Sequence, residues 1–144
     1  MSAALIAALF FTVVMLVITA YFLMGSVPLL ILKHDTPMDA RFVRGFFNTY
    51  YLAAMFTASA TAVGYGLAGR LYLATGAAAL ALLATILRWK FIPRMGTLGV
   101  EMTQSNGMGA ISEFRRIHVT ATLVNLTQLV LIVWTLIALS MQMR

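Results

Sequence analysis

Cysteine and charge are what this sequence has least of. None of the 144 residues is cysteine, only 10% are charged and 62% are hydrophobic, which gives a mean hydropathy of +0.94. The absence of cysteine excludes disulfide bonds, CxxC redox motifs and thiolate metal sites. A soluble domain carries about 25% charged residues, so this chain lacks the polar side chains that a water-facing surface needs. The composition excludes a soluble enzyme and predicts an integral membrane protein.

Long charge-free stretches indicate where the chain crosses the bilayer. No Asp, Glu, Lys or Arg occurs in residues 1–32, 45–69, 71–87 or 117–143. A helix across the bilayer core takes roughly 17–25 apolar residues, and each stretch meets that length. The stretches are continuous rather than alternating, which is unlike barrel strands. We predict an all-α membrane fold, a single domain over residues 1–144 that forms a four-transmembrane-helix bundle. The expected helices are about 4–32, 37–68, 70–91 and 111–142.

The basic residues are distributed unequally between the expected loops. Eight of the ten Lys and Arg residues lie near the loops between helices one and two and between helices three and four. Only Arg70 and Arg144 lie on the other side. Cytoplasmic loops concentrate Lys and Arg, so we predict that both termini are on the non-cytoplasmic side. We expect the membrane to be the bacterial inner (plasma) membrane.

Small residues recur at helical spacing and predict packing faces. Ala54, Ala58, Ala62 and Gly66 are four residues apart, and Ala74, Ala78 and Ala81 follow a similar pattern. Small residues allow close backbone approach between membrane helices. The contact is expected within the bundle, with a homo-oligomer or a larger membrane complex as the alternative. Lipid is the expected surrounding partner, and nucleic acid is not expected because the basic residues flank apolar spans.

Polar side chains recur on one face of two apolar stretches. In the last expected helix, Arg115, His118, Thr122 and Asn125 are spaced 3, 4 and 3 residues apart, which places them on one helix face. In the second expected helix, Arg44, Asn48 and Tyr51 are spaced 4 and 3 residues apart and also share a face. Intramembrane polar groups are costly and mark functional sites by default. We therefore predict an intrabundle ligand cavity open to the cytoplasm; under the alternative, these residues only bond between helices. The expected ligand-binding residues are Arg44, Asn48, Tyr51, Arg88, Arg115, Thr122 and Asn125.

His118 is the candidate acid or base if the protein is an enzyme, because histidine titrates near neutral pH without help. We expect its ring to hydrogen-bond to Glu101, Asn48 or Tyr51. No metal site is predicted, because His34 and His118 are the only histidines and neither forms an HxxxH or ExxH pair. A bis-histidine haem would require both of them as axial ligands. The sequence assigns no cofactor.

The segment 92–125 resembles a known family. Pro93, Met95 and Glu101 are followed by Phe114 and His118 in a Phe-x-x-x-His pattern and then by Asn125. This pattern is similar to that of small four-helix membrane proteins of the transmembrane-protein-205-like family.

Gly25, Pro28 and the pair Phe47-Asn48 are similar to the related anthrone-oxygenase-like family. The resemblance implies a four-helix membrane bundle and, in the oxygenase-like branch, cofactor-free oxidation of an aromatic substrate. The residues it implies are Pro93, Glu101, Arg115, His118 and Asn125. The chain has Pro93-Arg94-Met95 where that branch has Pro-x-Asn.

Two hypotheses about function follow. The first is a membrane protein that binds a hydrophobic or amphipathic ligand, quinone-like, aromatic or lipid-like, with oxidoreductase or oxygenase-like chemistry as an extension. The alternative is a non-catalytic accessory or assembly subunit of a larger membrane complex. Whether the protein is an enzyme is left open. The direction of the polar stripes separates the hypotheses: stripes that face each other favour a ligand, and stripes that face lipid require a covering partner.

Overall fold

The chain forms four helices, as expected. The computed structural model describes residues 2–31, 36–104 and 107–142. These residues form α1 (Ala3–Leu29), α2 (Pro37–Leu67), α3 (Leu71–Glu101) and α4 (Gly107–Gln142), with no strand among them. The all-α prediction is confirmed. Lys33, His34, Asp35 and Arg144 lie outside the described residues, so the haem hypothesis through His34 is not addressed.

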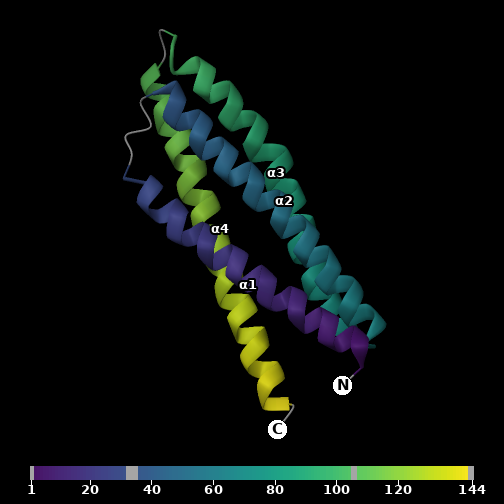
Figure 1. The fold of residues 1–144 in the computed structure, drawn as a ribbon. Coiled ribbons are helices and arrows are strands. Elements are labelled where there is room, and N and C mark those ends of the chain that lie inside the picture. Colours follow the sequence, from purple (N-terminus) through teal and green to yellow (C-terminus); the bar gives the residue numbers. More distant parts are fainter. Residues whose placement is uncertain (1, 32–35, 105–106, 143–144) are drawn as a thin grey trace.

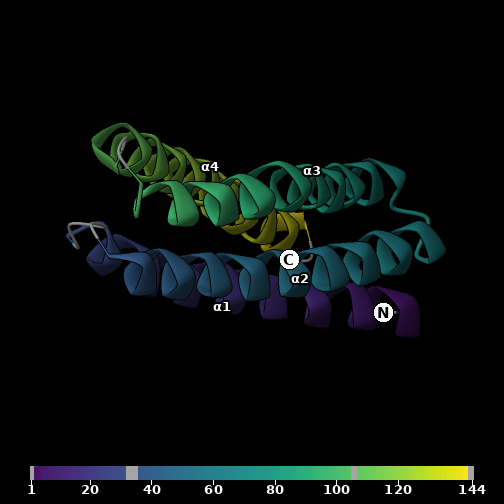
Figure 2. The same cartoon turned by 90° about the horizontal axis from the view of Figure 1, so that it is seen from above.

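The helices are arranged in two layers. Viewed from above, α1 and α2 form one layer and α3 and α4 the other (Figure 2). α2 and α3 lie side by side along their whole length, whereas α4 diverges from α3 toward its C-terminal end (Figure 1). We call the end with the α1–α2 and α3–α4 connections the loop end. The opposite end, with the α2–α3 turn and the free ends of α1 and α4, is the termini end.

Three of the four described helices are long and apolar enough to cross a membrane. They are α1, α3 and α4, whose most apolar windows have mean hydropathies of 2.7, 1.7 and 2.0. α2 is not among them although it has 31 residues. Its apolar run is diluted by tyrosines, threonines and glycines, and it begins with the charged turns that carry Arg41 and Arg44. The prediction of spans is therefore confirmed for three helices.

The expected start of the second helix is confirmed at atomic level. The Thr36 side chain accepts a hydrogen bond from the Asp39 backbone N–H at 3.2 Å, and Pro37 occupies the first turn. A proline at this position loses no helical hydrogen bond, because the first N–H groups have no partner within the helix. The chain reverses between α2 and α3 at Gly69, whose φ of 71° is left-handed, a conformation that glycine adopts without steric cost.

The predicted end of the third helix at residue 91 is wrong. α3 continues through Pro93 to Glu101. Proline inside a helix removes one backbone hydrogen bond. The helix continues because the residues after Pro93 pack into the core: Met95 and Leu98 are 1% and 0% exposed in the cluster shared with α2. α4 likewise begins at Gly107 rather than 111. Tertiary packing overrides the local helix-breaking signal at this loop.

The predicted small-residue faces are only partly correct. Ala54 and Ala58 are buried, but Gly66 is exposed and its Cα faces open space. Close approach to α1 occurs instead at Gly64, where an added Cβ would lie 3.0 Å from Ala8. On α3, Ala78 is exposed. The four-residue repeat drifts around the helix, since 3.6 residues make a turn, so it cannot follow one contact line over four steps.

The core is concentrated near the loop end. One large cluster joins all four helices there and contains Phe22, Phe47, Leu98 and Phe114, each no more than 2% exposed. Two small clusters continue toward the termini end, one around Met15, Ala58 and Ile132 and the other around Ala8, Tyr65 and Leu139. The loop-end half therefore holds the helices together more extensively, and most of the predicted site residues lie there.

Candidate functional site

His118 is hydrogen-bonded in a buried group with Ser26 and Thr122. It is fully buried on α4, and its Nε2 lies 3.1 Å from Ser26 Oγ and 3.2 Å from the Ser26 carbonyl oxygen on α1. Thr122 donates to the His118 carbonyl oxygen at 2.9 Å and lies 2.7 Å from Ser26 Oγ. Because the Thr122 proton is already used, Ser26 donates to Thr122. A carbonyl oxygen only accepts, so Nε2 carries a proton toward Ser26.

The partner of His118 Nε2 differs from the expectation. Glu101, Asn48 and Tyr51 were the expected partners, but the structure pairs this nitrogen with Ser26. Ser26 lies next to Gly25 in a helix with few polar side chains. The sequence signal for it was the recurrence of Thr12, Thr19 and Ser26 every seven residues, and all three hydroxyls are buried. The edge of the imidazole also contacts Phe47, with ring centroids 5.1 Å apart.

Tyr51 and Asn125 are buried without satisfied polar atoms. Tyr51 is 1% exposed and Asn125 is 0% exposed. The two side chains interact, yet the Tyr51 hydroxyl and both polar atoms of the Asn125 amide meet no hydrogen-bond geometry. An unsatisfied buried polar group costs about 1–3 kcal/mol.

The remaining predicted site residues separate into two groups. Arg88 on α3 donates from Nε to Asn48 Oδ1 on α2 at 3.0 Å, so these two residues are brought together. Arg44 and Arg115 are exposed and do not join the buried group. The polar stripes of α2 and α4 thus point inward for Asn48, Tyr51, His118, Thr122 and Asn125. Several of them bond from one helix to another, as the alternative in the sequence analysis expected, and the ligand hypothesis stays a prediction.

A second buried polar contact was missed by the sequence analysis. The Tyr50 hydroxyl donates to Gln128 Oε1 on α4 at 3.3 Å and lies 3.4 Å from Thr19 Oγ1 on α1. Gln128 is 7% exposed, although its position is somewhat to one side of the predicted stripe. The hydrogen bonds explain why an amide is tolerated at that depth.

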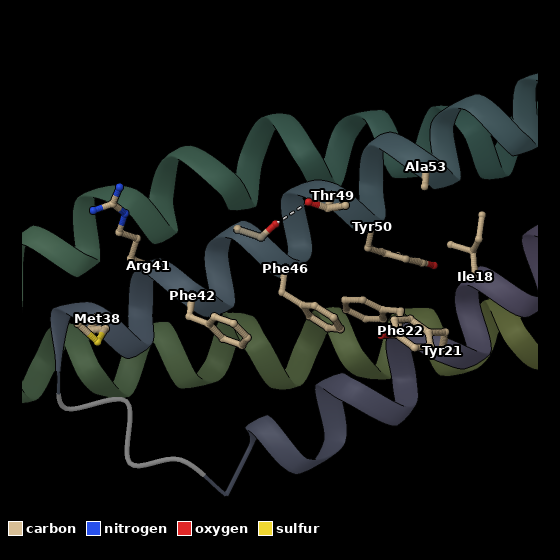
Figure 3. Close-up of a pocket in the computed structure, with 11 residues that line it drawn as sticks. Ile18, Tyr21, Phe22, Met38, Arg41, Phe42, Phe46, Thr49, Tyr50 and Ala53 are labelled. Atoms are coloured by element: carbon tan, nitrogen blue, oxygen red, sulfur yellow. Dashed lines mark hydrogen bonds between the residues drawn. The ribbon is translucent and has the colours of Figure 1, made fainter.

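The largest cavities do not coincide with the predicted one. The described cavities are lined by residues other than His118, Thr122, Asn125, Asn48 and Tyr51. One cavity, of about 660 Å³, is a groove between α1 and α2 (Figure 3). We call it the aromatic groove, because its lining includes Tyr21, Phe22, Phe42, Phe46 and Tyr50.

A stack of three rings forms the wall of the aromatic groove. Phe22 lies between Phe46 and Tyr50, with centroid distances of 5.1 Å and 4.0 Å and near-parallel planes. Gly25 makes room for this wall, because a Cβ there would lie 2.6 Å from the tip of the Phe46 ring. Arg41 lines the groove at its loop end and Ala53 lies toward its other end (Figure 3). Gly45 is also part of the lining.

Charge at the loop end is organised around Arg94. Its guanidinium contacts both carboxylate oxygens of Glu113 on α4 at 2.7 and 2.6 Å and Glu101 at 3.3 Å. A two-pronged contact between guanidinium and carboxylate is geometrically specific. It ties α3 to α4 just before their connection. Among the described residues these are the only ion pairs, and no group of three or more His, Cys, Asp or Glu side chains is placed to bind a metal.

No protein-family model, curated protein or solved structure matches the chain. The resemblance to the transmembrane-protein-205-like family therefore stays a prediction. Of the residues it implies, His118 and Asn125 are buried, whereas Glu101 is held by Arg94 and Arg115 is exposed. The geometry separates the implied residues into different parts of the loop end.

Proposed function

We propose that this chain is an integral membrane protein that binds an amphipathic molecule in the aromatic groove between α1 and α2. The observation that carries the proposal is the groove itself, with its wall of stacked rings and a single cation at its loop end. Ligand pockets commonly measure 300–1,000 Å³, and a few polar groups orient the ligand against a mostly apolar lining. The groove, of about 660 Å³, fits that description.

The membrane setting of the proposal includes α2. This helix lies antiparallel to α3 along its length (Figure 1), so if α3 crosses the bilayer, α2 crosses beside it. Its buried hydroxyls do not oppose this: Thr57 and Thr61 each donate to a carbonyl oxygen four residues earlier at 2.8 Å. Backbone and hydroxyl groups satisfied within the helix can enter hydrocarbon.

The orientation follows from the charge distribution, and both termini are then non-cytoplasmic. A cysteine replacing Ser2 should react with a membrane-impermeant thiol reagent in intact cells, whereas one replacing Gln104 in the α3–α4 connection should be protected. The reverse pattern contradicts the orientation.

The position of the groove decides how a ligand enters. Phe42 and Tyr21 are 61% and 72% exposed on the outer face of the bundle, so the groove opens sideways toward lipid. His118 does not line the groove, because Phe47 contacts both the Phe22 ring of the groove wall and the His118 ring. The Phe47 centroid is 4.8 Å from that of Phe22 and 5.1 Å from that of His118. Binding, rather than acid–base catalysis at His118, is the function that this arrangement supports.

A blocked groove tests the proposal. An added Cβ at Gly45 has no neighbour within 4 Å, so Gly45→Phe fills the groove without displacing backbone. The probe is a photoreactive fatty acid with a diazirine in its chain, and the labelled peptides are identified by mass spectrometry. Wild-type protein should be labelled at the α1 and α2 residues of the groove, and Gly45→Phe should lose this labelling.

Gly66→Phe is the matched control, because it lies on the same helix and is equally free of neighbours. It should be labelled like the wild type. Labelling of wild type spread evenly over the outer surface, or unchanged labelling in Gly45→Phe, would refute the proposal.

A further inference from the structure

A smaller pocket adjoins the aromatic groove at the loop end. It measures about 210 Å³ and lies between the first turns of α2 and the last turns of α3. Its lining includes Arg41 and Arg44 from α2 and Gly96 and Gly99 from α3. Arg41 lines both this pocket and the aromatic groove, so one side chain connects the two. We call the smaller site the arginine pocket.

In the part of the chain that the structure describes, the two arginines of the arginine pocket have no carboxylate partner. Among the described residues, the ion pairs at the loop end all belong to Arg94. Arg41 and Arg44 are three residues apart on α2, which places both guanidinium groups on one helix face. Asp39 is close in sequence but does not line the pocket. Two adjacent cations that no described carboxylate neutralises favour binding of an anion from outside the chain.

The backbone of α3 is shaped to hold Arg44 against it. A Cβ at Gly96 would lie 2.6 Å from Arg44 Nη1, the tip of a flexible side chain, so the guanidinium lies directly on the α3 surface at this glycine. At Gly99 the corresponding Cβ would be 3.5 Å from the Ala40 Cβ, which is an ordinary contact. Gly96 therefore leaves the space in which the Arg44 guanidinium lies over the pocket.

We infer that the amphipathic molecule of the aromatic groove is an anionic phospholipid whose phosphate is bound by Arg41 and Arg44 in the arginine pocket. The inference depends on the proposed function, since it names the chemistry of the same ligand. Arginine recognises phosphate through paired N–H donors. The groove beyond Arg41 runs along α2 to Ala53, twelve residues further, or roughly 18 Å at helical rise. That length accommodates an acyl chain, and an anionic leaflet supplies such lipids.

The test compares a zwitterionic with an anionic phospholipid that carry the same acyl chains. Wild-type protein is reconstituted in vesicles of phosphatidylcholine and phosphatidylglycerol, each carrying a diazirine in the acyl chain in separate experiments. Labelling of the groove should favour phosphatidylglycerol in the wild type. Arg41→Gln/Arg44→Gln should keep groove labelling and lose the preference. Arg115→Gln/Arg116→Gln, which removes the same charge from the same end on α4, should keep the preference.

A pair of glycine variants separates position from charge. Gly96→Ala keeps both arginines but displaces the Arg44 guanidinium, and the preference for phosphatidylglycerol should fall. Gly99→Ala should leave it unchanged, because its added methyl group meets only an ordinary contact. Arg44 is a flexible side chain, so Gly96→Ala should fold normally and report on the site even if the double arginine variant does not fold.

The outcomes distinguish the two claims. Groove labelling without a head-group preference in the wild type overturns the inference and leaves the proposed function intact. Absence of groove labelling overturns the proposed function. Equal loss of preference in Arg115→Gln/Arg116→Gln assigns the effect to bulk charge and overturns the inference. Loss of the preference on addition of inorganic phosphate shows that the pocket takes free phosphate and overturns the assignment to a lipid.

Discussion

Polar side chains are used differently in the two halves of the bundle. Near the loop end they bond from one helix to another: Ser26 to His118, Asn48 to Arg88, and Arg94 to Glu113. Toward the termini end, hydroxyls mostly bond to their own helix, as Thr61 does to Thr57 and Thr135 to Leu131. Thr12, which lies 3.2 Å from the Tyr65 hydroxyl, is an exception. Side-chain hydrogen bonds between helices therefore determine how the helices associate in the loop-end half, whereas close packing does so in the termini-end half.

The difference has a structural consequence for α4. In the loop-end half, α4 is fixed by the His118 contacts to α1 and by the Glu113 pair with Arg94. In the termini-end half it diverges from α3 (Figure 1), keeps only the small contacts of Ile132 and Leu139, and borders a cavity of about 500 Å³ that is also lined by α1, α2 and α3. The threonines lining this cavity, such as Thr75, satisfy their hydroxyls locally. The hydroxyl of Thr75 therefore makes no hydrogen bond to α4 across this cavity.

The largest effect should come from the core of the loop-end half. Phe47 is 0% exposed and contacts Phe22, Tyr51 and His118. Phe47→Ala should destabilise the protein by about 3 kcal/mol, the lower end for a buried phenylalanine. Thermal unfolding in detergent measures this loss. Phe56→Ala on the same helix is the control, because Phe56 is 70% exposed; similar losses from both variants would contradict the placement of the core.

The second effect tests packing by shape in the termini-end half. A side chain at Gly64 meets the backbone of Ala8 at 3.0–3.1 Å, and backbone cannot move aside as a side-chain tip can. Gly64→Leu should therefore separate α1 from α2 and cost about 1–3 kcal/mol. Gly66→Leu, two residues away in open space, should unfold at or above the wild-type temperature, since glycine is a poor helix former. Equal unfolding temperatures of the two variants would remove the argument for a close contact at Gly64.

Much of the fold could be predicted from the sequence because its signals are local. Charge-free stretches gave the positions of the helices, and the start of α2 was predicted because Thr36 and Pro37 act on the backbone next to them. The course of α3 beyond Pro93 could not be predicted in this way. It depends on the burial of Met95 and Leu98 against another helix, and no local pattern reports that.

The candidate site was predictable only in part. The spacing of His118, Thr122 and Asn125 correctly indicated one buried face of α4. It could not indicate which helix this face meets, and the Nε2 atom of His118 bonds to Ser26 on α1. Helix α1 has no charged residue, and only the hydroxyls Thr12, Thr19 and Ser26, seven residues apart, mark its buried face. The aromatic groove was missed because Phe22 and Phe46 come together only when α1 and α2 pack.

The smallest effect compares a bond between helices with one inside a helix. Ser26→Ala removes the contacts of Ser26 Oγ with His118 and Thr122 at 3.1 and 2.7 Å. Hydrogen bonds between membrane helices contribute about 0.6 kcal/mol on average and at most about 1.7 kcal/mol, and two are lost here.

Thr61→Val removes only a bond to the Thr57 carbonyl at 2.8 Å, and Thr61 is equally buried at 1% exposure. The Thr57 carbonyl still accepts its backbone hydrogen bond within α2, so the unfolding free energy of the valine variant should match that of the wild type within about 0.5 kcal/mol. Unfolding free energies from denaturant titration in mixed micelles measure both, and a greater loss in Thr61→Val than in Ser26→Ala would show that the two halves of the bundle do not differ as described.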